Sequence, residues 1–174
     1  MIRKVILILP FLFVAFSSNS QAIKKYSIDK TGCSLYMFCD PGKFDISYSD
    51  DSSRVYTGEC QNENFIYGII CVQLKEVVSA KDDGENLLEA YLNFLKQQFS
   101  IKETTGYGSG MHLKDREDII GMIDYWQSED KMQWAIQGWT DGNVLAVLYV
   151  KGNTQPDYAK QQVFFKGLRF PGMQ

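Results

Sequence analysis

The spacing of hydrophobic and polar residues changes along the chain. Between Cys33 and Leu74, short runs of alternating apolar and polar residues are separated by turn residues such as "DPGK" and "DDSS". This pattern is typical of β-strands. The predicted strands are "CSLYMFC", "FDISYS", "RVYTGEC" and "FIYGIICVQL", residues 33–39, 44–49, 54–60 and 65–74. The last strand is apolar on both faces, so we expect it to lie inside a sheet that is covered on both sides.

A helical period follows these strands. In "DDGENLLEAYLNFLKQQFS" the apolar residues recur three and four positions apart, which predicts a helix from about Glu85 to Phe99. Asp82 or Asp83 is its expected N-cap. Residues 101–114, which contain "GYGSG", show no clear period and are expected to form a loop or a frayed strand.

Three further strands are predicted at residues 118–128, 131–140 and 143–152, and they should form a meander because an Asp-Gly turn joins the last two. A second helix is predicted in "NTQPDYAKQQVFFKGL", with Thr154 or Gln155 as N-cap and Pro156 in its first turn. Its expected buried stripe is Tyr158 or Ala159, Gln162, Val163 and Phe165. The predicted fold class is α+β, a single domain with helices packed on an antiparallel sheet.

The N-terminus has the pattern of an export signal. Arg3 and Lys4 precede an apolar run from Val5 to Phe16, and "SQA" at residues 20–22 has the small-x-small pattern of a cleavage site. The alternative is a membrane anchor, but the run is shorter than the roughly 20 residues that a spanning helix needs. We therefore expect residues 1–22 to be a signal peptide cleaved after Ala22, and residues 23–174 to form one exported domain, periplasmic or secreted, without a transmembrane segment.

Charge narrows the choice of partner. The formal net charge is −3, and the expected signal peptide removes two basic residues and no acidic ones. No cluster of Lys or Arg is present, which argues against nucleic acid and anionic lipid headgroups as partners. We expect a protein, peptide or lipid partner in the cell envelope.

The four cysteines, Cys33, Cys39, Cys60 and Cys71, lack the close spacing of zinc ligands and of Cys-x-x-Cys redox centres. No metal or cofactor is expected, and export permits disulfides. In an extended strand Cys33 and Cys39 would be about 20 Å apart, too far to bridge. The remaining pairings are 33–60 with 39–71 and 33–71 with 39–60. A bend in the strand would instead allow 33–39 with 60–71.

Candidates for catalysis and binding are few. His112, the single histidine, lies beside the glycine-rich segment and is the one histidine that could activate a nucleophile. Neither a Gly-x-Ser-x-Gly motif nor a phosphate-binding loop is present. Trp126, Trp134 and Trp139 lie in the predicted meander, and the last two should face opposite sides of the sheet. They are expected to pack in the core, with an exposed ligand-binding face as the alternative.

The order of elements supports one resemblance. "GKFDISY", the helix "NLLEAYLNFLKQQF", the meander "MIDYWQ…KMQWAIQGWTDGNVLAVLYV" and the closing "FFKGLRF" together resemble the Mog1/PsbP-like superfamily, which includes bacterial exported DcrB-like proteins. The resemblance implies an α/β/α sandwich and a binding or assembly module without catalytic residues. The four cysteines depart from the usual members. We therefore expect an exported non-enzymatic binding module; the alternative is an exported thiol-dependent or hydrolytic enzyme using His112 or a cysteine.

Overall fold

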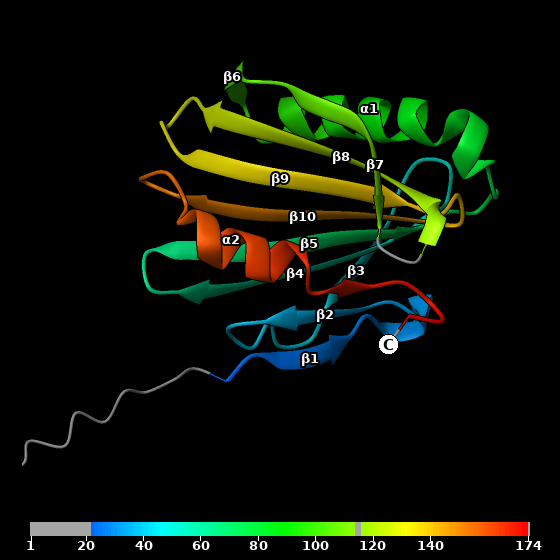
Figure 1. The fold of residues 1–174 in the computed structure, drawn as a ribbon, viewed down its shortest axis with the longest axis horizontal. Helices are drawn as coiled ribbons and strands as arrows, with labels where there is room; N and C mark the ends of the chain where they lie inside the picture. Colours follow the sequence, from blue (N-terminus) through cyan, green and yellow to red (C-terminus); the bar gives the residue numbers. More distant parts are fainter. Residues whose placement is uncertain (1–21, 114–115, 174) are drawn as a thin grey trace, which may run out of the picture.

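The computed structural model describes residues 22–113 and 116–173 (Figure 1). The expected signal peptide therefore lies, except for Ala22, outside the described residues. The elements are β1 (Lys24–Ser27), η1 (Asp29–Thr31), β2 (Ser34–Met37), β3 (Asp45–Tyr48), β4 (Arg54–Asn62), β5 (Phe65–Gln73), α1 (Ala80–Gln98), β6 (Ile101–Thr104), β7 (Tyr107–Leu113), β8 (Arg116–Ser128), β9 (Gln133–Thr140), β10 (Val144–Gly152), α2 (Tyr158–Phe165) and β11 (Leu168–Arg169).

The strands form two sheets whose neighbouring strands run antiparallel. The larger has eight strands in the order β3-β4-β5-β10-β9-β8-β6, with β7 also paired to β8. The predicted meander is confirmed as β8-β9-β10, and β10 lies beside β5 with Ala146 opposite Cys71. The smaller sheet has the order β1-β2-β11, so it joins the two ends of the described chain.

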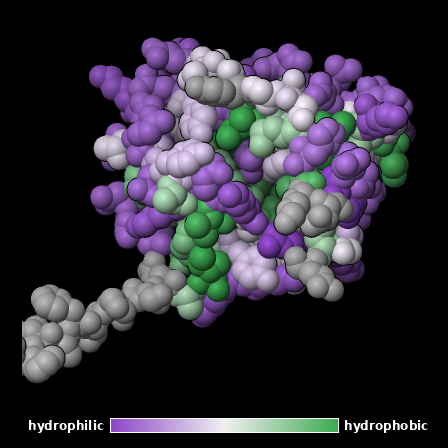
Figure 2. Space-filling view, in the orientation of Figure 1, coloured by the Kyte–Doolittle hydropathy of each residue, from purple (hydrophilic) through white to green (hydrophobic). Residues whose placement is uncertain are grey.

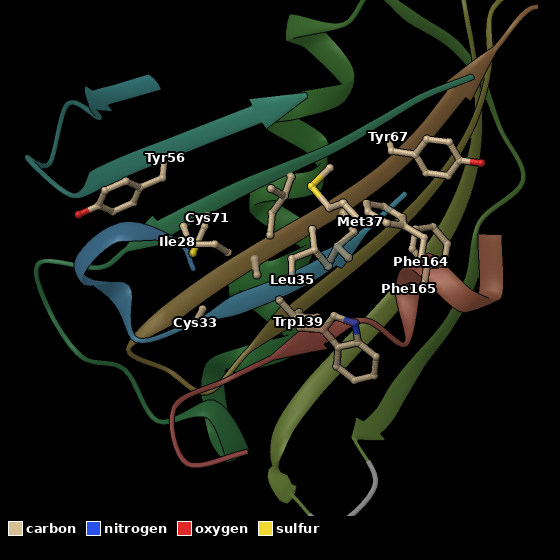
Figure 3. Packing of buried hydrophobic residues seen from close by; sticks show 14 of the residues in the cluster. Ile28, Cys33, Leu35, Met37, Tyr56, Tyr67, Cys71, Trp139, Phe164 and Phe165 are labelled. Atoms are coloured by element: carbon tan, nitrogen blue, oxygen red, sulfur yellow. The ribbon is translucent and has the colours of Figure 1, made fainter. Parts of the chain in front are cut away.

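The larger sheet is covered on both faces, and β5 lies inside it as its double-sided apolar pattern predicts. On one face α1 contributes Leu88, Leu92 and Leu95 to a hydrophobic cluster with side chains of β5, β8, β9 and β10. On the other face the smaller sheet and α2 pack against the same strands. Figure 3 shows Leu35 and Met37 of β2 facing Phe164 and Phe165 of α2 across this second cluster. The chain is thus a single α+β domain with two cores separated by one sheet.

The first helix begins five residues earlier than the sequence predicts. Ser79, not Asp82 or Asp83, is the N-cap of α1, and its hydroxyl accepts a hydrogen bond from the backbone N–H of Asp82 at 3.3 Å. The two aspartates lie in the first turn, where a negative charge favours the positive end of the helix dipole. Acidic residues suit both the cap and the first turn, which is why the sequence alone misplaced the boundary.

The second helix also begins at a different residue. Its N-cap is Asp157, whose carboxylate accepts from the backbone N–H of Lys160 at 2.9 Å, so Thr154, Gln155 and Pro156 precede the helix. The predicted buried stripe is wrong except for Phe165. Tyr158 and Val163 are 68% and 47% exposed, whereas the buried side chains of α2 are Gln161, Phe164 and Phe165.

The segment predicted as a loop or frayed strand contains two irregular strands, β6 and β7. Both pair with β8, and both pairings shift register. Gly106, Gly108 and Gly110 have positive φ, and the last two lie within β7, so this strand departs from regular β geometry at these positions. Across the described ranges, neither helix has the length and apolar character needed to span a bilayer.

Candidate functional site

A groove of about 780 Å³ lies between the first turns of α1 and the β7–β8 pair. In Figure 1, α1 begins at the end of the sheet where β7 leads into β8. The groove is lined mainly by residues with polar or charged side chains, which come from α1, β7 and β8. The lining residues are Lys81, Asp82, Glu85, Asn86, His112, Glu117, Asp118 and Ile120.

Local sequence explains how these elements come together. Positions 81, 82, 85 and 86 lie on one side of α1, because residues four apart follow one another along a helix. Gly84 faces the sheet, where an added Cβ would approach Thr140 Cγ2 to 3.3 Å and Ile120 Cδ1 to 3.5 Å. The missing side chain therefore lets the start of α1 lie close to β8 and β9. His112 is paired with Ile120 across β7 and β8.

The groove is predominantly negative. Four of its side chains are carboxylates, and Lys81 is the opposing cation among the lining residues. Arg116 forms a two-point ion pair with Asp118, at 2.7 Å and 2.6 Å, and also donates to the Pro171 carbonyl at 3.0 Å. The hydrogen bonds from Arg116 lower the pKa of Asp118, which keeps this carboxylate ionised. Asp82 accepts from the Ser79 hydroxyl at 2.7 Å, so a cationic group entering the groove would first meet Glu85 and Glu117, which form no ion pair within the described part of the chain.

His112 has a fixed partner in this groove. Its Nδ1 lies 3.0 Å from the carbonyl oxygen of Glu117, and the side chain is exposed. In the neutral ring this contact requires the proton on Nδ1, which leaves Nε2 as the basic nitrogen. None of the residues that line the groove in the described structure carries a hydroxyl or thiol group. The structure does not bring His112 together with a cysteine, since Cys33 and Cys71 lie in the core between the two sheets.

One predicted disulfide is present. Cys39 and Cys60 are bonded, with their Cα atoms 5.7 Å apart, and the bond joins the segment after β2 to β4. This agrees with the pairing of 39–60 and excludes both the 39–71 and the 33–39 alternatives. Cys33 and Cys71 are free thiols in this structure and both are buried, so the second expected disulfide is not formed here.

The three tryptophans are core residues. Trp126, Trp134 and Trp139 are 2%, 6% and 3% exposed, so they do not form the exposed binding face considered from the sequence. Trp134 and Trp139 belong to different clusters, as expected for opposite faces of β9. Trp134 stacks on Phe99 at 4.9 Å, and its Nε1 donates to the Ser128 hydroxyl. Their burial follows from the helix on one face and the smaller sheet on the other.

The face that carries α2 offers a second hollow of about 500 Å³, lined in part by Tyr125, Pro156 and Tyr158. Figure 2 shows that hydrophobic residues on this face form separate small areas among hydrophilic ones. This hollow lacks the concentration of like charge that marks the groove beside α1. We therefore take the groove as the candidate site. Sequence reasoning identified His112 but not the acidic residues around it, of which it considered Asp82 only as a helix cap.

Comparison of the chain with protein-family models finds no matching family, and comparison with curated proteins finds no significant match.

Proposed function

We propose that this protein is an exported, non-enzymatic binding module of the Mog1/PsbP-like kind, whose α1–β8 groove binds a lysine- or arginine-containing segment of a partner protein. The proposal rests on one observation: four carboxylates line a single groove of about 780 Å³. This volume is within the range of roughly 300–1,000 Å³ typical of ligand sites.

The charge of the groove supports a cationic ligand. Ammonium and guanidinium groups donate several hydrogen bonds each, and carboxylates are their strongest acceptors in proteins. Glu85 and Glu117 are exposed, so they are accessible to a ligand without rearrangement of the core. The single lysine among the lining residues, Lys81, would repel a ligand with two cationic groups placed near it. Selectivity for the spacing of charges in the partner follows from this arrangement.

Export and fold class also support the proposal. A disulfide between Cys39 and Cys60 suits an oxidising compartment. The two helices pack on opposite faces of the larger sheet, an arrangement that is consistent with the sandwich implied by the resemblance.

The test is binding of fluorescent peptides that carry Lys or Arg at varied spacing, with peptides of the same composition carrying Asp or Glu for comparison. The double variant Glu85→Gln/Glu117→Gln should weaken binding of the cationic peptides roughly tenfold, since two exposed charge pairs are each worth about 0.2–1 kcal/mol. Added salt should weaken binding to the wild-type protein as well.

The matched control is Glu76→Gln, which removes an exposed carboxylate in the segment before α1 that does not line the groove. It should leave peptide affinity unchanged. Absence of saturable binding for every cationic peptide would contradict the proposal, as would equal weakening by Glu76→Gln.

A second candidate function uses the same groove. His112 holds its Nδ1 proton on the Glu117 carbonyl, so Nε2 could act as a general base on a bound substrate. The variant His112→Gln separates the two candidates. A binding module should retain its affinity for cationic peptides in this variant, whereas a hydrolase should lose turnover on every substrate that the wild-type protein cleaves.

A further inference from the structure

Cys33 and Cys71 meet at the interface between the two sheets. Cys33 directly precedes β2, and Cys71 lies within β5; their side chains are 1% and 0% exposed and belong to one cluster. In Figure 3 both lie near Ile28 at the same end of this cluster. Each thiol affects the pKa of the other, and the Thr31 hydroxyl affects the pKa of both, as expected of groups that lie close together.

The backbone on each side holds the thiols in this place. The turn around η1 fixes Cys33, since its carbonyl accepts from the N–H of Ile28 at 2.9 Å and its N–H donates to Thr31 Oγ1 at 3.0 Å. Cys71 is fixed by pairing with strands on both sides, opposite Tyr56 and Ala146. The small side chain of Ala146 limits crowding on the face of β5 that Cys33 approaches.

The formed disulfide lies too far away to exchange with this pair. In the β4–β5 register Cys60 is opposite Tyr67, four residues from Cys71, which corresponds to about 13 Å along the strand. Cys33 and Cys39 lie beyond opposite ends of β2. The two cysteine pairs are thus separate, and neither can replace the other without unfolding the β2 layer.

We propose that Cys33 and Cys71 form a second disulfide in the exported protein, so that both ends of β2 are covalently attached to the larger sheet. The oxidant is a protein or small-molecule disulfide of the oxidising compartment. Two S–H bonds are broken and one S–S bond forms in the chain, while two electrons and two protons reduce the disulfide of the donor to two thiols. Because both sulfurs are buried after folding, the exchange takes place before β2 docks on the sheet.

The electrostatics of the pair agree with direct sulfur contact. The hydrogen bond from Cys71 lowers the pKa of Cys33, and the same contact raises the pKa of Cys71, which burial raises further. The pKa values of the two thiols shift in opposite directions, as expected for two groups that share one proton.

Peptide mapping tests the proposal on the full chain, purified without reductant from the compartment to which it is exported. The protein is denatured in iodoacetamide and digested without reduction. Trypsin is unsuitable, because no Lys or Arg lies between residues 33 and 39 or between 60 and 71. A protease that cleaves after aromatic residues separates all four cysteines, at Tyr36 or Phe38 and at Phe65 or Tyr67. We expect no alkylated cysteine and a linked peptide pair containing Cys33 and Cys71.

Alkylation of Cys33 and Cys71 together with an intact 39–60 link would overturn the proposal, as would any other pairing. A stability comparison gives a second, independent result. The wild-type protein and the variant Cys33→Ala/Cys71→Ala are each melted with and without reductant, and far-ultraviolet circular dichroism confirms that both are folded. The fall in Tm caused by the reductant should be larger in the wild type, which loses two disulfides, than in the variant, which loses one. Equal falls would contradict the second disulfide.

Discussion

At the scale of single residues, Asp124 is a buried charge with four partners in the described structure. Its carboxylate is buried and accepts from the backbone N–H groups of Gly106 and Tyr125 and from Trp126 Nε1, at 2.7, 2.8 and 2.6 Å. Lys96 of α1 is its fourth partner, with Nζ 3.0 Å from Asp124 Oδ2. One side chain thus ties β8 to the helix and to the turn between β6 and β7. An isolated aspartate in the apolar run "DIIGMIDYWQS" was the sequence signal for such a role.

Replacing Asp124 with Ala should lower the free energy of unfolding by about 3 kcal/mol, because the buried Trp126 Nε1 and the N–H groups of Gly106 and Tyr125 lose their acceptor and Lys96 loses its ion-pair partner. Urea denaturation followed by tryptophan fluorescence measures the change. The control is Glu129→Ala, which breaks the exposed pair with Lys102 and should cost about 1 kcal/mol or less. A similar loss in both variants would contradict the role of Asp124.

At the scale of elements, sequence reasoning found the strands with a clear hydrophobic pattern and missed element boundaries that several residues can satisfy. The strand β5 and the meander followed from pattern alone, since burial on two faces or one imposes the pattern directly. The strand β1 was not foreseen. The starts of α1 and α2 were misplaced because Ser, Asp and Thr near each start all make acceptable caps. The groove could not be predicted, because its walls come from α1, β7 and β8 and meet only after the sheet forms.

The N-cap of α2 can be tested directly. The variant Asp157→Ala should lower the free energy of unfolding by about 1 kcal/mol, since the backbone N–H of Lys160 loses its acceptor. Thr154→Ala, at the cap position expected from the sequence, should change it by less than about 0.5 kcal/mol. Chemical denaturation of both variants gives the comparison. A larger loss in Thr154→Ala would place the start of the helix where the sequence suggested.

At the scale of the whole molecule, two tyrosines with raised pKa values make stability depend on pH in the alkaline range. Burial raises the pKa of Tyr91 to about 12. It also raises the pKa of Tyr149 strongly, and the hydroxyl of Tyr149 donates to the Glu59 carboxylate. The folded protein therefore keeps two protons that the unfolded chain releases above about pH 10. The stability that these tyrosines contribute is fully present below pH 10 and is lost as the pH rises through their folded values.

The free energy of unfolding should fall between about pH 10 and 12 by about 1.4 kcal/mol per pH unit for each of these tyrosines. Urea denaturation at a series of pH values measures the slope, and phenolate absorbance of the folded protein reports how many tyrosines ionise at each pH. The variant Tyr149→Phe should show a shallower slope than the wild type. An unchanged slope in this variant would show that Tyr149 is not one of the groups responsible.

The smaller sheet also constrains the kinetics of folding. On one side of β2, Leu35 pairs with Tyr26, which is synthesised just before it. On the other side Leu35 pairs with Leu168, near the end of the chain. The hairpin of β1 and β2 can form early, but this layer cannot be completed until Leu168 and Arg169 have been synthesised. Contacts of such long sequence separation form slowly. During synthesis the edge of β2 that pairs with β11 therefore stays unpaired, and an unpaired strand edge favours aggregation.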